Sequence, residues 1–396
     1  MELDKIYLDP KDFGAVGDGE HDDTEAIRAA MQQAAEKHCS VRFSAGVYRT
    51  DVIYVPQQIE VCAAVTWSYQ FVGRTVLIPA HEDQECILEI SDAIGTTFYG
   101  ISLDGRGMGT NLHGMSMNRE RHVTRAEHSI RIDNCRVFNC SGNGINMVGA
   151  WAVSMRQSQC IGNKGYGFYL DGCDAFIVDN WFSGNGKAGF GGDTWNSAVN
   201  FTSNRVEWNR ECGVKLMGGM RYNLTGNYFD RAFGPAIVIV DAPNFHKRLH
   251  KEHTVMPYAI TVTGNTIVRS GAQAEPGSND DCQIYMRKAV GCTVTGNTFN
   301  VWKSDGAGGR VSPWYGIILE QCAHCAVTSN AMMAGAVKEL IVDRGGHGAG
   351  MVIANNTGIP LPEAAWECQD PFTPVHFLSE GGAPWYSEML EGESNE

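Results

Sequence analysis

Short segments that end in asparagine recur along most of this chain at a spacing near 23 residues. Asn180, Asn204 and Asn227 are separated by 24 and then 23 residues. Further segments of this kind end at Asn134, Asn265, Asn297, Asn330 and Asn355. A period of this length indicates a stack of similar units, each of which buries its apolar residues against its neighbours.

A second short segment with alternating apolar residues precedes each of these asparagines. Gly213-Val214-Lys215-Leu216 is one example, and no helical pattern separates it from the segment that follows. Strands that recur without crossover helices can pair with the equivalent strand of the next turn of the chain. We therefore expect an all-β fold, a single-stranded parallel β-helix of roughly nine or ten coils. The recurrent asparagines would stack in a turn ladder.

The ends of such a stack expose unpaired strand edges and need covers. Residues 22–37 have the apolar spacing of a helix, and Asp22 with Glu25 fits a capping box at its start. We expect this helix to cap a β-helix domain of residues 1–360. Residues 361–396 would form a tail that packs on the last coil and ends in disorder.

The net charge of the chain limits the classes of partner that it is expected to bind. The chain has 396 residues and a formal net charge of −14, which disfavours long-range attraction to nucleic acid or to an anionic membrane. It has no long apolar run, and its first ten residues lack the layout of a signal peptide. We expect a cytoplasmic location, or secretion if the start has been trimmed.

The first 50 residues carry a family resemblance. Asp12-Phe13-Gly14-Ala15-Val16-Gly17-Asp18-Gly19, the helix, and then Val41–Tyr48 resemble the entry segment of right-handed β-helix enzymes of the polygalacturonase-like and pectate-lyase-like superfamily. The resemblance implies a right-handed helix and action on an oligosaccharide or polysaccharide. Fructotransferase-like relatives imply a possible homotrimer. Hydrolases, lyases and tailspikes share this scaffold, so the resemblance does not fix the reaction.

Alignment of the coils places the candidate catalytic residues on one outward-facing column. Asp171 and Asp193 fall on adjacent coils, about 4.8 Å apart at the backbone. Two carboxylates that close divide into a protonated acid and an ionised base or nucleophile, as glycosidic cleavage requires. Lys215 on the next coil would bind sugar hydroxyls, and Tyr169 and Trp195 would stack on sugar faces. The alternative is that both aspartates merely end strands in solvent.

A second cluster on this column holds Arg287, Glu320 and Asp343 on three successive coils, next to Tyr285. Long insertions border the column here, at residues 243–257, 271–281 and 302–313. A charge ladder that stabilises the stack would explain these residues, and a substrate-binding groove is the other interpretation.

No residue pattern requires a metal or other cofactor. Cys322 and Cys325 flank His324, but Cys292 occupies the same coil position as Cys325, so stacked turn cysteines explain the spacing better than zinc. The thirteen cysteines are expected to be reduced.

Three functions remain open. The first is a glycoside hydrolase or transglycosidase that uses Asp171 and Asp193. The second is a lyase that eliminates across a uronic acid, with Arg287 or Lys215 as base and Ca²⁺ held by acidic residues. The third is a non-catalytic glycan-binding or tailspike-like module.

Overall fold

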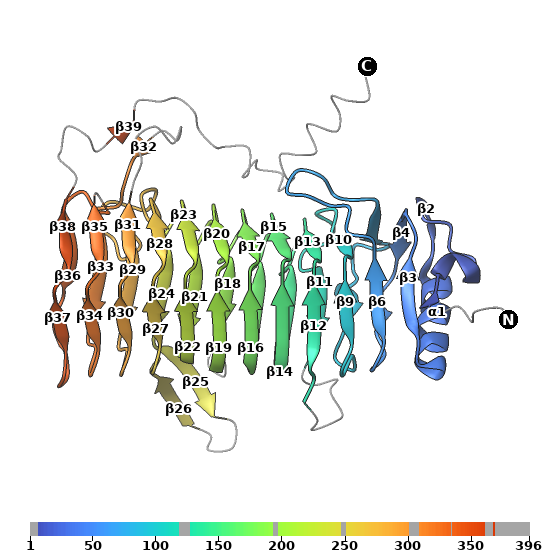
Figure 1. The fold of residues 1–396 in the computed structure, drawn as a ribbon, viewed down its shortest axis with the longest axis horizontal. Coiled ribbons are helices and arrows are strands. Elements are labelled where there is room, and N and C mark those ends of the chain that lie inside the picture. The colour runs from blue at the N-terminus through green and yellow to red at the C-terminus, as the bar shows by residue number, and fades with distance from the viewer. Residues whose placement is uncertain are drawn as a thin grey trace. The chain divides into compact units, whose positions relative to one another are not determined.

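The computed structural model describes residues 7–118, 127–192, 197–246, 251–300, 309–333, 335–360 and 367–368. The chain divides into two compact units, Met1–Tyr169 with Leu378–Glu396, and Leu170–Phe377. Each unit consists of coils with three short parallel strands, which form three faces named here face 1, face 2 and face 3 (Figure 1).

In the first unit, face 1 contains β5 (Ile53–Tyr54), β8 (Cys86–Glu89), β11 (His113–Met117) and the start of β14 (Ile145–Arg156). Face 2 contains β1 (Tyr7–Leu8), β3 (Ser40–Phe43), β6 (Glu60–Ala63), β9 (Thr97–Tyr99), β12 (Ile130–Asp133) and the end of β14. Face 3 contains β2 (Asp18–Asp22), β4 (Gly46–Thr50), β7 (Thr75–Pro79), β10 (Ser102–Asp104), β13 (Arg136–Phe138) and β15 (Gln159–Ile161).

In the second unit, face 1 contains β18 (Phe190–Gly192), β21 (Val214–Met217), β24 (Ile237–Val240), β29 (Cys282–Arg287), β33 (Tyr315–Glu320) and β36 (Glu339–Asp343). Face 2 contains the end of β16 (Phe168–Val178), from Cys173 onwards, and β19 (Ser197–Thr202), β22 (Met220–Thr225), β27 (Thr261–Thr263), β30 (Thr293–Thr295), β34 (Ala326–Thr328) and β37 (Val352–Ala354). Face 3 contains β17 (Trp181–Ser183), β20 (Arg205–Glu207), β23 (Tyr228–Asp230), β28 (Thr266–Val268), β31 (Thr298–Asn300), β35 (Ala331–Met333) and β38 (Thr357–Ile359). The parallel β-helix is therefore confirmed, but the predicted nine or ten coils are too few, because the strands of face 3 in the described residues number 13.

Two antiparallel pairs lie outside the coils. β25 (Ala242–His246) and β26 (Lys251–Val255) form a hairpin inside the first predicted insertion, and β32 (Gly309–Arg310) pairs with β39 (Glu367–Cys368). Apart from residues 367–368, the predicted tail 361–396 lies outside the described residues, so its packing stays a prediction.

The capping helix is present as α1 (Thr24–Lys37), after a 3-10 turn at Pro10–Phe13. Its apolar side is buried through Ile27, Ala30, Met31 and Ala34. The predicted capping box is wrong in detail, because the helix begins one residue later than expected.

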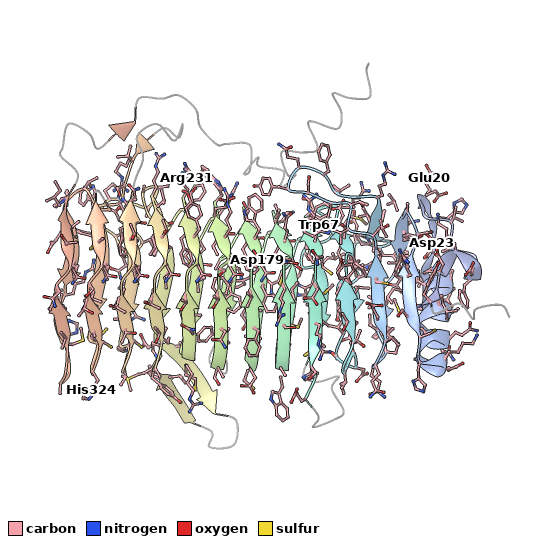
Figure 2. All side chains as sticks on the ribbon, viewed as in Figure 1. Glu20, Asp23, Trp67, Asp179, Arg231 and His324 are labelled. Atoms are coloured by element: carbon pink, nitrogen blue, oxygen red, sulfur yellow. The ribbon has the colours of Figure 1, made fainter. Side chains whose placement is uncertain are left out.

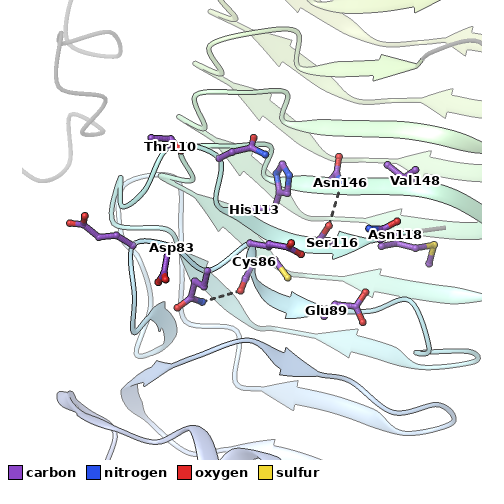
Figure 3. Close-up of a pocket in the computed structure, with 14 residues that line it drawn as sticks. Asp83, Cys86, Glu89, Thr110, His113, Ser116, Asn118, Asn146 and Val148 are labelled. Carbon is purple, nitrogen blue, oxygen red and sulfur yellow. Dashed lines mark hydrogen bonds between the residues drawn. The ribbon is translucent and has the colours of Figure 1, made fainter. Parts of the chain in front are cut away.

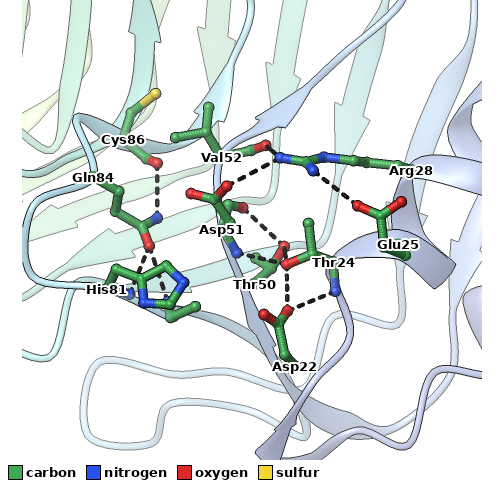
Figure 4. Close-up of polar contacts among 11 residues, drawn as sticks. Asp22, Thr24, Glu25, Arg28, Thr50, Asp51, Val52, His81, Gln84 and Cys86 are labelled. Carbon is green, nitrogen blue, oxygen red and sulfur yellow. Dashed lines mark hydrogen bonds and ion pairs between the residues drawn. The ribbon is translucent and has the colours of Figure 1, made fainter.

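Asp23 is the N-cap residue and its carboxylate accepts from the backbone N–H groups of Val16 and Gly17, at 2.6 and 3.1 Å. Asp22 binds Thr24, and Glu25 pairs with Arg28 at 2.9 Å (Figure 4). Arg28 also donates to Asp51 at 3.2 Å, which ties the helix to the strands beneath it.

The asparagine ladder runs through the turns of the second unit. Each side-chain amide donates to the next asparagine at 2.9 to 3.1 Å, through Asn180, Asn204, Asn227, Asn265, Asn297, Asn330 and Asn356. Two predicted members are wrong by one residue. Asn134 and Asn355 both have left-handed backbone angles, and Cys135 and Asn356 take the inward positions beside them.

In the first unit, a loop between β6 and β7 lies against face 3. Arg136 is fully buried and donates to the carbonyl groups of Ser68, Tyr69 and Phe71. Trp67, labelled in Figure 2, donates from its indole N–H to the carbonyl of Asn134 at 2.8 Å. Tyr69 and Val72 of the same loop also pack against Phe138 and Ile161, so polar and apolar contacts together hold it.

Candidate functional site

Parallel pairing on face 1 of the first unit brings four polar side chains into one outward stripe. Tyr54 pairs with Glu89, Glu89 with Ser116, and Ser116 with Asn146. Because adjacent strands lie about 4.8 Å apart, this stripe runs about 14 Å across the strands.

A groove with a volume of about 380 Å³ lies along part of this stripe (Figure 3). It is lined by Glu82, Asp83, Gln84, Glu85, Cys86, Glu89, Thr110, Asn111, His113, Ser116, Met117, Asn118, Asn146 and Val148. Among the described residues, the lining combines carboxylates with uncharged amide and hydroxyl groups and contains neither lysine nor arginine, while residues 119–126, which follow Asn118, lie outside the described part of the chain. Such a set suits the hydroxyl groups of an uncharged sugar and repels a uronate.

Glu89 lies at the end of β8 with only 3% of its surface exposed. Its carboxylate accepts from the hydroxyl and from the backbone N–H of Ser91, the latter at 3.3 Å. The Ser91 hydroxyl in turn accepts from the backbone N–H of Asn118 at 2.9 Å. These contacts fix the carboxylate at the edge of the groove.

His113 faces the groove one strand further along. Its Nδ1 accepts from the backbone N–H of Asn143 at 2.8 Å, so the neutral ring carries its proton on Nε2. Burial lowers the pKa of His113 below 6.5, against the opposing effects of that bond and of Glu85. The ring is therefore a neutral hydrogen-bond donor near pH 7 rather than a cation.

Gly142 explains how the ring fits. A Cβ at this position would lie 2.6 Å from Nδ1 of His113 and 2.9 Å from the carbonyl oxygen of Asn111. Neighbouring amides also fix Asn146, which accepts from Asn143 at 2.9 Å and donates to Ser116 at 3.3 Å. The groove wall is thus hydrogen-bonded internally before any ligand arrives.

The acidic loop of the groove is anchored by Gln84, which is 8% exposed. Its carbonyl accepts from the backbone N–H groups of Ala80 and His81 at 2.9 and 3.0 Å, and its amide donates to the carbonyl of Cys86 at 2.9 Å (Figure 4). Asp83 and Glu85 on either side remain exposed.

The second unit contains the other predicted cluster. On its face 1, the predicted column is correct from β18 to β33, since Lys215 pairs with Gly191 and Val238, and Tyr285 pairs with Val238 and Ile318. Lys215 forms an ion pair with Glu211. Although burial opposes its charge, that pair raises the pKa of Lys215 above its usual value.

Tyr285 is 5% exposed, so its ring face is covered. Its hydroxyl donates to Glu320 at 3.1 Å and accepts from Asn279 at 3.2 Å. Burial, followed by the nearby Glu320 carboxylate, raises the pKa of Tyr285 to about 12. Asn279 belongs to the insertion at residues 271–281, which therefore borders the column as predicted.

Arg287 pairs in register with Glu320 but forms its ion pair elsewhere. Its guanidinium donates to Asp241 at 2.7 Å, and Lys288 donates to the same carboxylate at 3.0 Å. Burial opposes ionisation of Asp241, yet these two cations hold its pKa below the usual value. The charges of this cluster neutralise one another.

Asp343 is displaced from the predicted column. It pairs with Leu319 rather than with Glu320, and it accepts from the backbone N–H of Gly345 and contacts His347, both at 2.7 Å. Every residue of β36 is partly or fully exposed. The strand therefore lacks the buried alternation that would have fixed its register from sequence.

The predicted carboxylate pair is only partly described. Asp171 lies half-buried on β16, and Tyr169 packs against Tyr166 with ring centroids 5.3 Å apart. Asp193 and Trp195 lie outside the described residues, so the pair stays a prediction.

Sequence reasoning missed Glu89, Glu85 and His113 as site residues. The signal for Glu89 was present, because the column that contains Ser116 and Asn146 continues one coil towards the N-terminus. No sequence pattern indicated Glu85, because it lies in a loop that only the fold brings to the stripe.

Cys292 and Cys325 stack as predicted, with the backbone N–H of Cys292 3.4 Å from the sulfur of Cys325. Within the described ranges the cysteines are free thiols. In the same ranges, no group of three or more His, Cys, Asp and Glu side chains is arranged to hold a metal ion, and no helix is long and apolar enough to cross a membrane.

Comparison with known proteins gives two family matches. Residues 83–251 match the right handed beta helix region, and residues 9–59 match the model for rhamnogalacturonase A/epimerase, pectate lyase-like. The second match contains the entry segment that carried the resemblance.

Curated relatives cover part of the chain. Depolymerase 1, capsule K30/K69-specific, of a Klebsiella phage is 27% identical over 225 residues, which are 52% of this chain and 27% of that protein. A probable glucan endo-1,3-beta-glucosidase of Arthroderma benhamiae is 22% identical over 262 residues, 59% of this chain and 28% of that protein. The chain thus spans little more than a quarter of the length of these relatives.

Solved structures share the fold. The Dettilon tailspike protein has a TM-score of 0.62 at 15% identity over 88% of this chain and 68% of that one. A surface adhesin of Streptococcus pneumoniae has a TM-score of 0.65 at 14% identity over 90% of each chain. A mannuronan C-5 epimerase module of Azotobacter vinelandii has a TM-score of 0.55 at 14% identity over 90% of this chain and 98% of that one.

Family models, shared architecture and entry segment agree with one another. The chain therefore has the right-handed parallel β-helix fold, and its entry segment is similar to that of pectate-lyase-like proteins.

Proposed function

We propose that this chain is a glycoside hydrolase that cleaves an uncharged oligosaccharide or polysaccharide in the groove of its first unit. The observation that carries the proposal is the groove lining, whose described residues combine carboxylates and neutral sugar-binding groups without lysine or arginine. The relatives support it by name, since one is a capsule depolymerase and another a glucan glucosidase.

Glu89 and Glu85 are the carboxylates proposed for the reaction. Glu89 accepts two hydrogen bonds from Ser91, which hold its carboxylate at the edge of the groove, and it is the group proposed as the base that removes a proton from water. Glu85 donates a proton to the leaving oxygen as the C–O bond breaks and water adds to the anomeric carbon.

The distance between the two carboxylates bears on whether the reaction retains or inverts the configuration at the anomeric carbon. Glu85 lies in the bend just before β8 and Glu89 at the end of that strand, so their Cα atoms are at most about 14 Å apart. A retaining enzyme needs its carboxyl groups about 5 Å apart, whereas an inverting enzyme needs roughly 6.5 to 9.5 Å. The wider gap is easier to reach from this backbone, so we expect inversion of the anomeric centre.

A panel of glycans tests the proposal. Purified protein is incubated with β-1,3-glucan, capsular polysaccharides of types K30 and K69, and polygalacturonate, and the products are analysed by mass spectrometry and by proton NMR of the first anomer released. We expect products from an uncharged glycan that have gained water and show the inverted anomer. Unsaturated products from the uronate polymer, or binding without any product, would contradict hydrolysis.

Asp171 and Asp193 remain the alternative carboxylate pair. Their proposal is separable from the groove, because Asp171→Asn and Asp193→Asn leave every groove residue intact. Loss of turnover in these variants with full turnover in Glu89→Gln and Glu85→Gln would move the active site to that pair.

A further inference from the structure

A second concavity lies next to the groove on face 1 of the first unit. It has a volume of about 460 Å³ and is lined by Tyr54, Val55, Pro56, Gln57, Glu89, Asp92 and Ile94. We call it the Tyr54 hollow. Like the groove, it is lined without lysine or arginine.

Glu89 lines both concavities. Tyr54 lies beside Glu89 on the preceding strand, and the backbone N–H of Val55 donates to the carbonyl of Glu89 at 2.9 Å. Ser116 lies beside Glu89 on the following strand. A chain of sugars that crosses the strands would therefore pass from the groove over Glu89 into the Tyr54 hollow.

The composition of the hollow suits a sugar ring. Tyr54 is 57% exposed, so its ring is accessible to a ligand in the hollow. Its ring, together with Pro56 and Ile94, offers an apolar surface for the C–H face of a pyranose. Gln57 and Asp92 are exposed and offer hydrogen-bond partners for the hydroxyl groups at its edge.

We infer that the Tyr54 hollow is a binding subsite for an uncharged sugar residue, on the opposite side of Glu89 from the groove. The inference rests on the proposed function and extends it. The groove reaches from Glu89 over Ser116 to Asn146, about 10 Å across the strands, so it also takes sugar residues beyond the one next to the cleaved bond, and that bond is internal to the glycan. The enzyme then cuts within chains and releases oligosaccharides, not single terminal sugars.

Two variants and a control test this subsite. β-1,3-linked glucose oligomers of two, four and six units are titrated into wild type, Tyr54→Ala, Tyr54→Phe and Tyr99→Ala by calorimetry. Tyr99 is 41% exposed on face 2 of the same unit, which makes it a matched exposed tyrosine away from the stripe. Product sizes from β-1,3-glucan are measured in parallel.

We expect affinity to rise with oligomer length in wild type. Tyr54→Ala should lose about tenfold in affinity for the six-unit oligomer, because the ring no longer covers apolar surface, while Tyr54→Phe and Tyr99→Ala keep it. Products should be oligosaccharides from the start of the reaction.

Other results would overturn the subsite. One is that Tyr54→Ala binds the six-unit oligomer as tightly as wild type does, or that Tyr99→Ala loses as much affinity for it as Tyr54→Ala. The others are that wild type binds no oligomer, or that only single sugars are released. The proposed function fails differently: length-dependent binding that depends on Tyr54, without cleavage of any glycan, would refute hydrolysis and leave the subsite standing.

Discussion

His113 illustrates how packing alone can shift the pKa of one residue. Its ring is held between the backbone N–H of Asn143 and the small Gly142, and burial keeps it neutral near pH 7. Neither neighbour is close in sequence, so the tuned histidine could not be identified from its local sequence. Glu89 differs, since its place on the stripe follows from the same two-residue alternation that placed Ser116 and Asn146.

The lowered pKa of His113 makes stability depend on pH. The unfolded chain binds a proton near pH 6.5, whereas the folded chain resists it, so stabilisation present above pH 6.5 is lost as pH falls through the folded-state value. His113→Asn keeps an acceptor for Asn143 and removes the titration. Urea unfolding at pH 7.5 and 5.5 should show a smaller loss of stability in this variant than in wild type.

His38→Asn is the control, because His38 is exposed and has the left-handed backbone angles that asparagine tolerates. The same pH dependence in wild type and His113→Asn would contradict the assigned cause.

At the scale of secondary-structure elements, the turns between strands set the length of each coil and stack the coils on one another. The asparagine spacing predicted the coils and the ladder because a buried amide must find a partner, and the next coil supplies one. The predicted positions were wrong in two kinds of place. In β36 no residue is buried, so no alternation of buried and exposed residues fixes the register. At Asn134 and Asn355 a residue with left-handed backbone angles lies next to the true ladder position. The loop held by Arg136 could not be predicted, since its bonds join residues more than 60 positions apart.

The ladder predicts a large effect of one amide. Asn227 is 2% exposed, accepts from Asn204, and donates to Asn265 and to the carbonyl of Phe201. Asn227→Ala leaves these buried groups unpaired and should lower the free energy of unfolding by about 3 kcal/mol. Asn223→Ala, on the same coil but half-buried, should cost less than about 1 kcal/mol. Equal urea midpoints for the two variants would contradict a stabilising ladder.

Arg136 makes a separate prediction. Arg136→Met keeps the apolar stem but leaves the carbonyl groups of Ser68, Tyr69 and Phe71 unpaired, which should cost about 2 to 3 kcal/mol and expose the loop to limited proteolysis. Arg131→Met, which removes an exposed arginine from the same unit, is the matched control. Resistance of the Arg136→Met loop equal to that of the control would show that these bonds do not hold it.

At the scale of the whole molecule, charge and scaffold act together. A net charge of −14 repels polyanions at long range, and the described lining of the groove repeats that preference locally with four carboxylates and neither lysine nor arginine. The scaffold could be predicted from the repeat and the entry segment. The position of the groove could not, because it depends on loops brought together by coil stacking.

Turnover of an uncharged glycan by Glu89→Gln, compared with wild type and Asp171→Asn, tests the central proposal most directly. Glutamine keeps the size of the side chain and cannot accept a proton from water. The account predicts a fall of at least about a hundredfold in kcat for Glu89→Gln, with unchanged thermal unfolding, and near-normal turnover for Asp171→Asn. Wild-type turnover by Glu89→Gln would contradict it.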